Sequence, residues 1–135
     1  MSFSTSVDTE ILNQVFVGTA LSWNGNTNLW LALHTANPGK AGTPTTSEIA
    51  YTGYARIPIS RTTGFTVTSA TIQNTNLAQF PVATGGTGVA TYCSVVTTAS
   101  GAGSVIVFGP LNSTVSVTSG IQPQFSAGSL TFTLD

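Results

Sequence analysis

The sequence predicts a mainly β fold, an antiparallel β-sandwich or jelly roll with one short N-terminal helix. About eight short apolar or alternating segments follow one another roughly a dozen residues apart, separated by Gly, Pro, Asn or Ser. Val, Thr and Phe, which favour strands, are common. No helical patterns alternate with the strands, which argues against a parallel α/β fold. The 135 residues fit a single domain over residues 1–135.

One helix is predicted, over about residues 6–17. The Thr5-Ser6 pair can cap its start, and Gly18 can end it. We expect its apolar stripe to pack on the body of the domain, so that Leu12→Asp or Phe16→Asp would destroy folding or assembly. Docking of the helix on a partner is the alternative. The stripe consists of residues at helical spacing: Val7, Ile11, Leu12, Val15 and Phe16.

The chain after the helix is predicted to form a turn, a strand and a long loop. Asn24-Gly25 is a turn signal. The uninterrupted apolar run at residues 29–33 predicts a strand buried on both faces, which His34 ends. Residues 35–46 have the composition of a loop, and residues 47–50 are compatible with one helical turn.

Strand patterns dominate from residue 55 onward. In residues 55–61, Ile57 and Ile59 share one face, and Pro58 predicts an edge or bulged strand because it cannot donate to a ladder. The glycine-rich residues 85–88 are predicted to be a flexible connection. The further predicted strands cover residues 65–68, 77–82, 89–96, 104–108, 114–118 and 130–134.

Charged residues are unusually scarce. They make up 5% of the chain, against a usual share of about a quarter, and the formal net charge is −1 at pH 7. A compact monomer of this mass exposes roughly 6,600 Å², which leaves about one charge per 900 Å². Soluble small domains normally carry a much denser charge coat. We therefore expect partner chains to cover much of the surface, with the protein a homo-oligomer, most simply a trimer. The alternative is that uncharged polar residues hydrate the surface alone.

The same scarcity excludes several classes of function. Three basic residues cannot neutralise enough phosphates for nucleic-acid binding. A membrane role would need a basic amphipathic helix or an apolar run of about 20 residues, and the sequence has neither pattern. Residues 1–5 lack the charged start and apolar stretch of a secretion signal, so we expect the protein to stay in the cell that makes it until it is released.

No catalytic or cofactor-binding arrangement is predicted. A Ser-His-Asp triad could be built only on His34, and no Gly-x-Ser-x-Gly elbow is present. The four acidic residues show no spacing suited to paired-carboxylate chemistry, and one His with one Cys gives too few metal ligands. We expect Cys93 to be a small buried residue and His34 to end its strand with satisfied hydrogen bonds. The protein is thus expected not to be an enzyme and to need no cofactor or metal.

Six residues are candidates for contacts with other chains. An unpaired buried arginine is costly, so one interpretation is that Arg56 or Arg61 forms a salt bridge with a neighbouring subunit. The expected acceptors are Glu48 and Asp135 of that neighbour. The alternative is that both arginines lie on a solvated edge strand. Aromatic residues on predicted loops are candidates for stacking on sugars. The six interface candidates are Arg56, Arg61, Glu48, Tyr51, Tyr54 and Trp23, and Phe65 joins the aromatic ones for stacking.

Residues 33–56 resemble a signature of small tailed-phage virion proteins. The stretch consists of Leu33-His34-Thr35-Ala36-Asn37-Pro38-Gly39, Ala41-Gly42-Thr43 and the segment 47–56. The early helix, the Gly-Ala-Gly turn at residues 101–103 and the closing strand also fit, so the resemblance covers nearly the whole chain. Proteins of this group are described as tail-fibre-like or decoration proteins.

The resemblance implies a structural component of a bacteriophage virion with no catalytic residues. Our first interpretation is a capsid decoration, or cement, protein that binds the major capsid protein and stabilises the outer shell. The alternative is a tail-fibre or baseplate protein involved in binding a host receptor. In either case the expected partners are virion proteins, and the expected location is the virion, after synthesis in the host cytoplasm.

Overall fold

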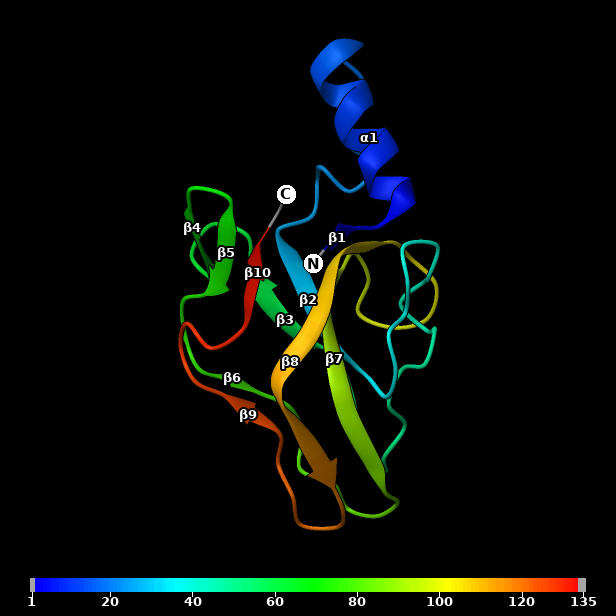
Figure 1. Cartoon of the computed structure of the whole chain (residues 1–135), viewed down its shortest axis with the longest axis vertical. Coiled ribbons are helices and arrows are strands. Elements are labelled where there is room, and N and C mark those ends of the chain that lie inside the picture. The colour runs from blue at the N-terminus through cyan, green and yellow to red at the C-terminus, as the bar shows by residue number, and fades with distance from the viewer. Residues whose placement is uncertain (1, 134–135) are drawn as a thin grey trace.

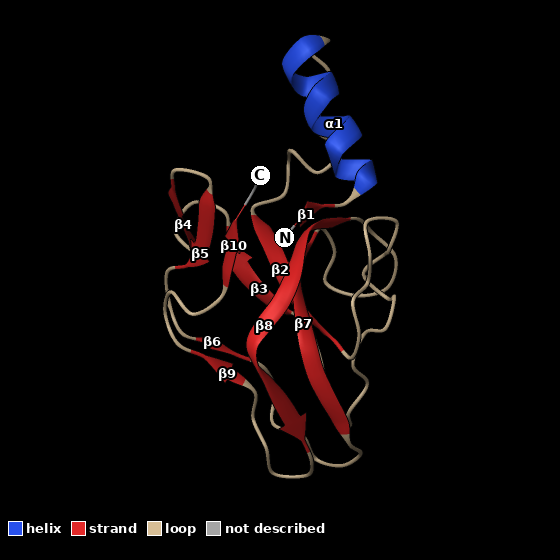
Figure 2. Cartoon of the chain, in the orientation of Figure 1, coloured by secondary structure: helices blue, strands red, loops and turns tan. Residues whose placement is uncertain are grey.

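The computed structural model describes residues 2–133, in which one helix projects from the end of a body built of strands (Figure 1). Strands dominate the body, and long loops connect them (Figure 2). The elements are, in chain order, β1 (Ser2–Phe3), α1 (Thr5–Phe16), β2 (Asn28–His34), β3 (Ile57–Ser60), β4 (Phe65–Thr68), β5 (Thr71–Asn74), β6 (Ala78–Gln79), β7 (Gly88–Val96), β8 (Val105–Val117), β9 (Gln124–Phe125) and β10 (Thr131–Thr133).

The largest sheet has five antiparallel strands in the order β1-β8-β7-β2-β3. Leu31 of β2 lies opposite Val95 of β7 on one side and Ile57 of β3 on the other. A strand paired on both sides and buried on both faces accounts for the uninterrupted apolar run of β2, as predicted. Pro58 also lies as predicted, because β3 is an edge strand of this sheet.

Two smaller antiparallel sheets complete the body, one in the order β10-β5-β4 and one formed by β6 and β9. The core lies between these sheets and the large one, and its members come from all three. Leu31 and Val95 of the large sheet belong to the same buried cluster as Phe132 of β10 and Phe125 of β9. The predicted fold class, mainly β and antiparallel with one N-terminal helix, is confirmed.

The predicted strands at residues 104–108 and 114–118 are one continuous strand, β8. Its pairing with β7 shifts register between Ala90, which lies opposite Val115, and Tyr92, which lies opposite Pro110. The strand therefore bulges outward just after Pro110, which cannot donate to the ladder, and then rejoins its partner. A local break in the sequence pattern thus marks a bulge rather than the end of a strand.

Three further expectations differ from the structure. The short strands β1, β5 and β9 were not predicted, because they are brief and largely polar in sequence. Residues 47–50 do not form a helical turn, since Ser47 has a φ of 53° and Glu48 forms a β-bridge with His34. The predicted strand at 77–82 is reduced to the two residues of β6.

Helix α1 begins at Thr5, one residue earlier than predicted, and its cap is correspondingly earlier. Ser4 is the N-cap, and its Oγ accepts a hydrogen bond from the Val7 amide at 3.4 Å. The same hydroxyl donates to the Val105 carbonyl, which joins the cap to strand β8. The helix ends as predicted, because Gly18 has a φ of 76° and the Thr19 amide donates back to the Asn13 carbonyl at 3.1 Å.

Candidate functional site

Helix α1 exposes most of its apolar stripe. Only Val7 is buried and Ile11 half-buried, where the first half of the helix meets the body. The other three residues of the stripe point into solvent, with exposed fractions of 57% for Leu12, 65% for Val15 and 78% for Phe16, and Val17, the C-cap that follows, is 71% exposed. We call these four residues the apolar tip. The expectation that the stripe packs on the body is wrong for the tip, because the helix continues beyond the body (Figure 1).

The base of the helix is fixed to the body by polar contacts. The Thr5 amide donates to the Lys40 carbonyl at 2.9 Å, and the Lys40 ammonium lies 3.0 Å from the Asp8 carboxylate. The chain that returns from the helix is also tied to it, because the Ser22 hydroxyl donates to the Glu10 carboxylate at 2.6 Å. Together with the Ser4 cap, these contacts set the direction in which the tip points.

The tip belongs to a long uncharged stretch of the chain. Residues 11–39 contain no Asp, Glu, Lys or Arg. Covering the tip with another protein surface would therefore desolvate no ion of this chain, and it would remove four large apolar side chains from water. An exposed apolar patch of this kind is often a contact site for another protein.

The leading interface candidate, Arg56, is buried and paired within its own chain. Its Nε donates to Glu48 Oε2 at 2.7 Å and its Nη2 donates to Glu48 Oε1 at 2.9 Å. Its remaining N–H groups donate to the Thr98 carbonyl and hydroxyl and to the Gly101 carbonyl, at 2.9–3.1 Å. The expectation of an intersubunit bridge between Arg56 and Glu48 is therefore wrong. The other expected acceptor, Asp135, lies outside the described residues.

Two tyrosines that were candidates for surface contacts support this ion pair and its surroundings. The Tyr54 hydroxyl donates to Glu48 Oε2 at 2.8 Å and accepts from the Leu33 amide at 3.2 Å. Burial is the main cause that raises the pKa of Tyr54. Tyr51 is buried, and its hydroxyl donates to the Pro81 carbonyl at 2.7 Å. Neither ring is placed to stack on a sugar.

Arg61 and Trp23 stabilise a turn. The Arg61 guanidinium lies 5.2 Å from the centre of the Trp23 ring, within cation–π range. Its Nη1 donates to the carbonyls of Trp23, Asn24 and Asn26 at 2.8–3.3 Å. Both side chains are half-buried, as is Phe65. The six interface candidates thus form two groups: a buried network around Arg56, and a turn that hydrogen bonds from Arg61 hold in place. None of the six belongs to the apolar tip.

His34 is buried at the end of β2 with both ring nitrogens occupied, as expected. Nδ1 lies 2.8 Å from the Thr46 carbonyl, which can only accept, so Nδ1 carries the proton. Nε2 then accepts from the Ser94 hydroxyl at 2.7 Å. Burial is the main cause that lowers the pKa of His34, opposed by the Thr46 hydrogen bond and by Glu48. The imidazole is neutral, and its two bonds make it a structural group.

We expect acid to destabilise the fold through His34. An unfolded histidine titrates near pH 6.5, and the folded group titrates lower, so the unfolded chain binds more protons below that pH. This contribution is fully present above about pH 6.5 and is lost as the pH falls toward the folded pKa, by at most about 1.4 kcal/mol per pH unit. Urea unfolding between about pH 7.5 and 5.5 measures it. His34→Gln should flatten the profile in this window, and an equally steep profile would contradict the assignment.

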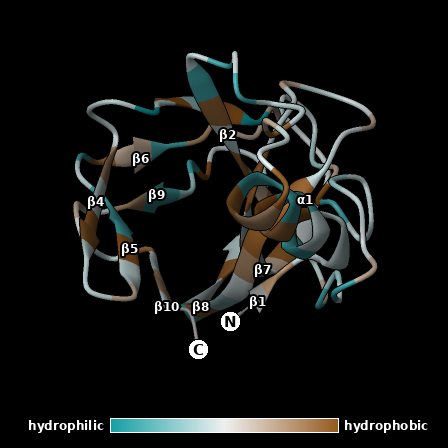
Figure 3. Cartoon of the chain, turned by 90° about the horizontal axis from the view of Figure 1, so that it is seen from above, coloured by the Kyte–Doolittle hydropathy of each residue, from teal (hydrophilic) through white to brown (hydrophobic). Residues whose placement is uncertain are grey.

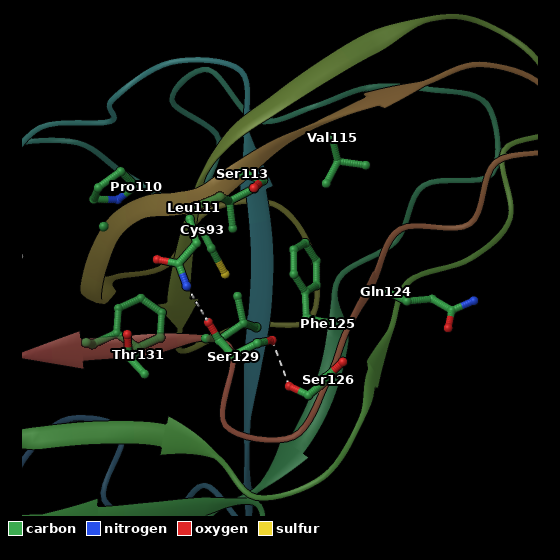
Figure 4. Close-up of a pocket in the computed structure, with 14 residues that line it drawn as sticks. Cys93, Pro110, Leu111, Ser113, Val115, Gln124, Phe125, Ser126, Ser129 and Thr131 are labelled. Carbon is green, nitrogen blue, oxygen red and sulfur yellow. Dashed lines mark hydrogen bonds between the residues drawn. The ribbon is translucent and has the colours of Figure 1, made fainter.

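A pocket of about 250 Å³ lies between β8, β9 and β10 (Figure 4). Asn112 Nδ2 donates to the Ser129 carbonyl at 3.3 Å across its mouth, and the Ser129 hydroxyl donates to the Ser126 carbonyl at 2.7 Å. The lining residues are apolar or uncharged polar and include no acid, base or histidine. Cys93 borders the pocket, but it is buried, and burial raises the pKa of its thiol to about 12, so it is unreactive. Sequence reasoning missed this pocket because its walls come from three segments that no spacing connects.

The described residues give no other sign of a chemical site. Residues 2–133 contain no group of three or more His, Cys, Asp or Glu side chains arranged to hold a metal ion. Helix α1, the helix found in this part of the chain, is too short to cross a membrane.

Comparison with known protein families gives a match that spans the whole described region. The model of a family described as "Podophage GP4 fiber I protein gp80" matches residues 2–133. No curated protein matches the chain.

Proposed function

Because the chain belongs to the family of the podophage GP4 fiber I protein gp80, a family of phage structural proteins, we propose that it is a non-enzymatic component of a virion fibre. The observation that carries this proposal is the extent of the match, which leaves almost no part of the chain outside the family pattern. The description of the family favours a fibre over the capsid decoration that was our first interpretation.

The partners that we propose are other virion proteins and further copies of this chain. Two features of the molecule support this. Charged residues make up only 5% of the chain, so most of its surface can be covered without desolvating ions. The base of α1 is held by the body while its apolar tip is left in water. A trimer, expected from the sparse charge, is one form that such an assembly can take.

Labelling of purified phage particles tests the location. Gold-labelled antibody against this protein is expected to mark the fibres, with an antibody against the major capsid protein marking the head as the control. Label spread over the capsid surface would contradict the fibre proposal and support the decoration protein. Label on neither structure would contradict both.

A further inference from the structure

The outer half of α1 has no support within its own chain. From Leu12 to Ala20 every residue is exposed. A helix as short as this one is marginal in water unless its apolar face packs on something. The tip therefore needs a cover. We infer that the cover is the apolar tip of a second copy of this chain, so that copies associate helix to helix.

The apolar tip is large enough to form a contact, although a weak one. Phe16 exposes more than three-quarters of its side chain, and an aromatic side chain can bury ~150–250 Å², so the four tip residues together offer roughly 400 Å². Patches of this size on a monomer are often functional. A stable interface typically buries about 800 Å² per partner. The area of this contact is thus at the low end for protein interfaces, which suits reversible association. Such a contact becomes stronger where a particle holds many copies together.

Charge favours a second copy as the occupant. In a contact between two identical surfaces, residues near the two-fold axis face their own copies, so a charged residue there would meet a like charge. Residues 11–39 carry no charged side chain, so this penalty is absent at the tip. Asp8 at the base is paired with Lys40, and Glu10, the charged residue next to this stretch, accepts hydrogen bonds from the Ser22 amide and hydroxyl. Antiparallel packing of the two helices is also favourable, because their dipoles then point in opposite directions.

The position of the helix limits how two copies can meet. Viewed from above the helix, the body extends beyond α1 on every side (Figure 3). Copies standing side by side with parallel long axes could not bring their helices together without overlap of their bodies. The copies therefore meet end to end or splayed apart, with the tips crossing between them. This contact concerns the free protein, so it does not depend on where the protein lies in the particle.

Thiol crosslinking tests the contact directly. Phe16→Cys places a thiol on the apolar tip, and Gln14→Cys places one on the other face of the same turn as the matched control. The native Cys93 is buried and does not compete. With a short bis-maleimide at about 50 µM protein, a concentration suited to a weak interface, we expect a covalent dimer from Phe16→Cys and severalfold less from Gln14→Cys. Equal crosslinking of the two variants would overturn the inference.

Sedimentation gives a second measurement on the unmodified chain. The wild-type protein should show concentration-dependent association, and Phe16→Ser should weaken it at least tenfold while leaving the thermal unfolding temperature nearly unchanged. Gln14→Ser, at an exposed position on the side of the helix away from Phe16, should associate like wild type. A wild-type chain that remains monomeric at about 100 µM would overturn the inference. A Phe16→Ser variant that associates like wild type would also overturn it. If the chain did not self-associate but Phe16→Ser were lost from purified virions, the tip would be assigned to a contact with another virion protein.

Discussion

Arg56→Ala is expected to lower the free energy of unfolding by about 3–5 kcal/mol, because it leaves the Glu48 carboxylate without its arginine partner in a buried site. Only 2% of the Arg56 side chain and 15% of the Glu48 side chain are exposed. Arg56 also closes the loop that contains Thr98 and Gly101, so its removal takes away the donor to two carbonyls and one hydroxyl of this loop. Denaturant unfolding measures the loss.

Lys40→Ala is the matched control for this prediction. The ion pair between Lys40 and Asp8 is exposed, with 55% and 40% of the two side chains in solvent, and exposed pairs contribute only about 0–1 kcal/mol. Arg56→Lys should recover little stability, since one ammonium cannot replace two parallel bonds to Glu48 and three to the loop. A loss from Arg56→Ala no larger than that from Lys40→Ala would contradict the role assigned to the network.

Elements of the fold were predictable where the local sequence pattern alone determines the structure. An apolar run such as residues 29–33 can be satisfied only by burial on both faces, and β2 is that strand. Pro58 similarly had to lie at an edge. The sequence did not predict strands whose formation depends on the strands that pair with them. Strand β5 contains Gln73 and Asn74, which do not favour strands, and it is held in place because β4 and β10 pair with it on both sides.

The candidate site was predictable only in part, for a related reason. The sequence indicated that a buried arginine needs an acid, but it could not show whether that acid lay in the same chain, and Glu48 proved to be the intrachain partner. The helix that carries the apolar stripe was predicted correctly from its spacing. Its spacing is the same whether the cover is the body or another chain, so only the structure could show that Phe16 lies beyond the body.

The core and the tip can be separated by one pair of identical substitutions. Phe80 is completely buried, its ring stacks on Tyr54 with centroids 6.3 Å apart, and it meets the edge of Phe125 at 6.1 Å. Phe80→Ala should therefore cost about 3–5 kcal/mol, from lost burial and the cavity left behind. Phe16→Ala removes the same atoms from a side chain that is 78% exposed, and it should change stability by no more than about 0.5 kcal/mol.

Both variants should be unfolded with denaturant at low micromolar concentration, where self-association adds no stability to the folded state. If Phe16→Ala were as costly as Phe80→Ala under these conditions, the tip would be packed within a single chain, and both the position of the helix and the association inferred from it would be wrong. A large loss at Phe80 with a small one at Phe16 would locate the core between the sheets. It would also leave assembly as the reason for four large apolar side chains at the end of α1.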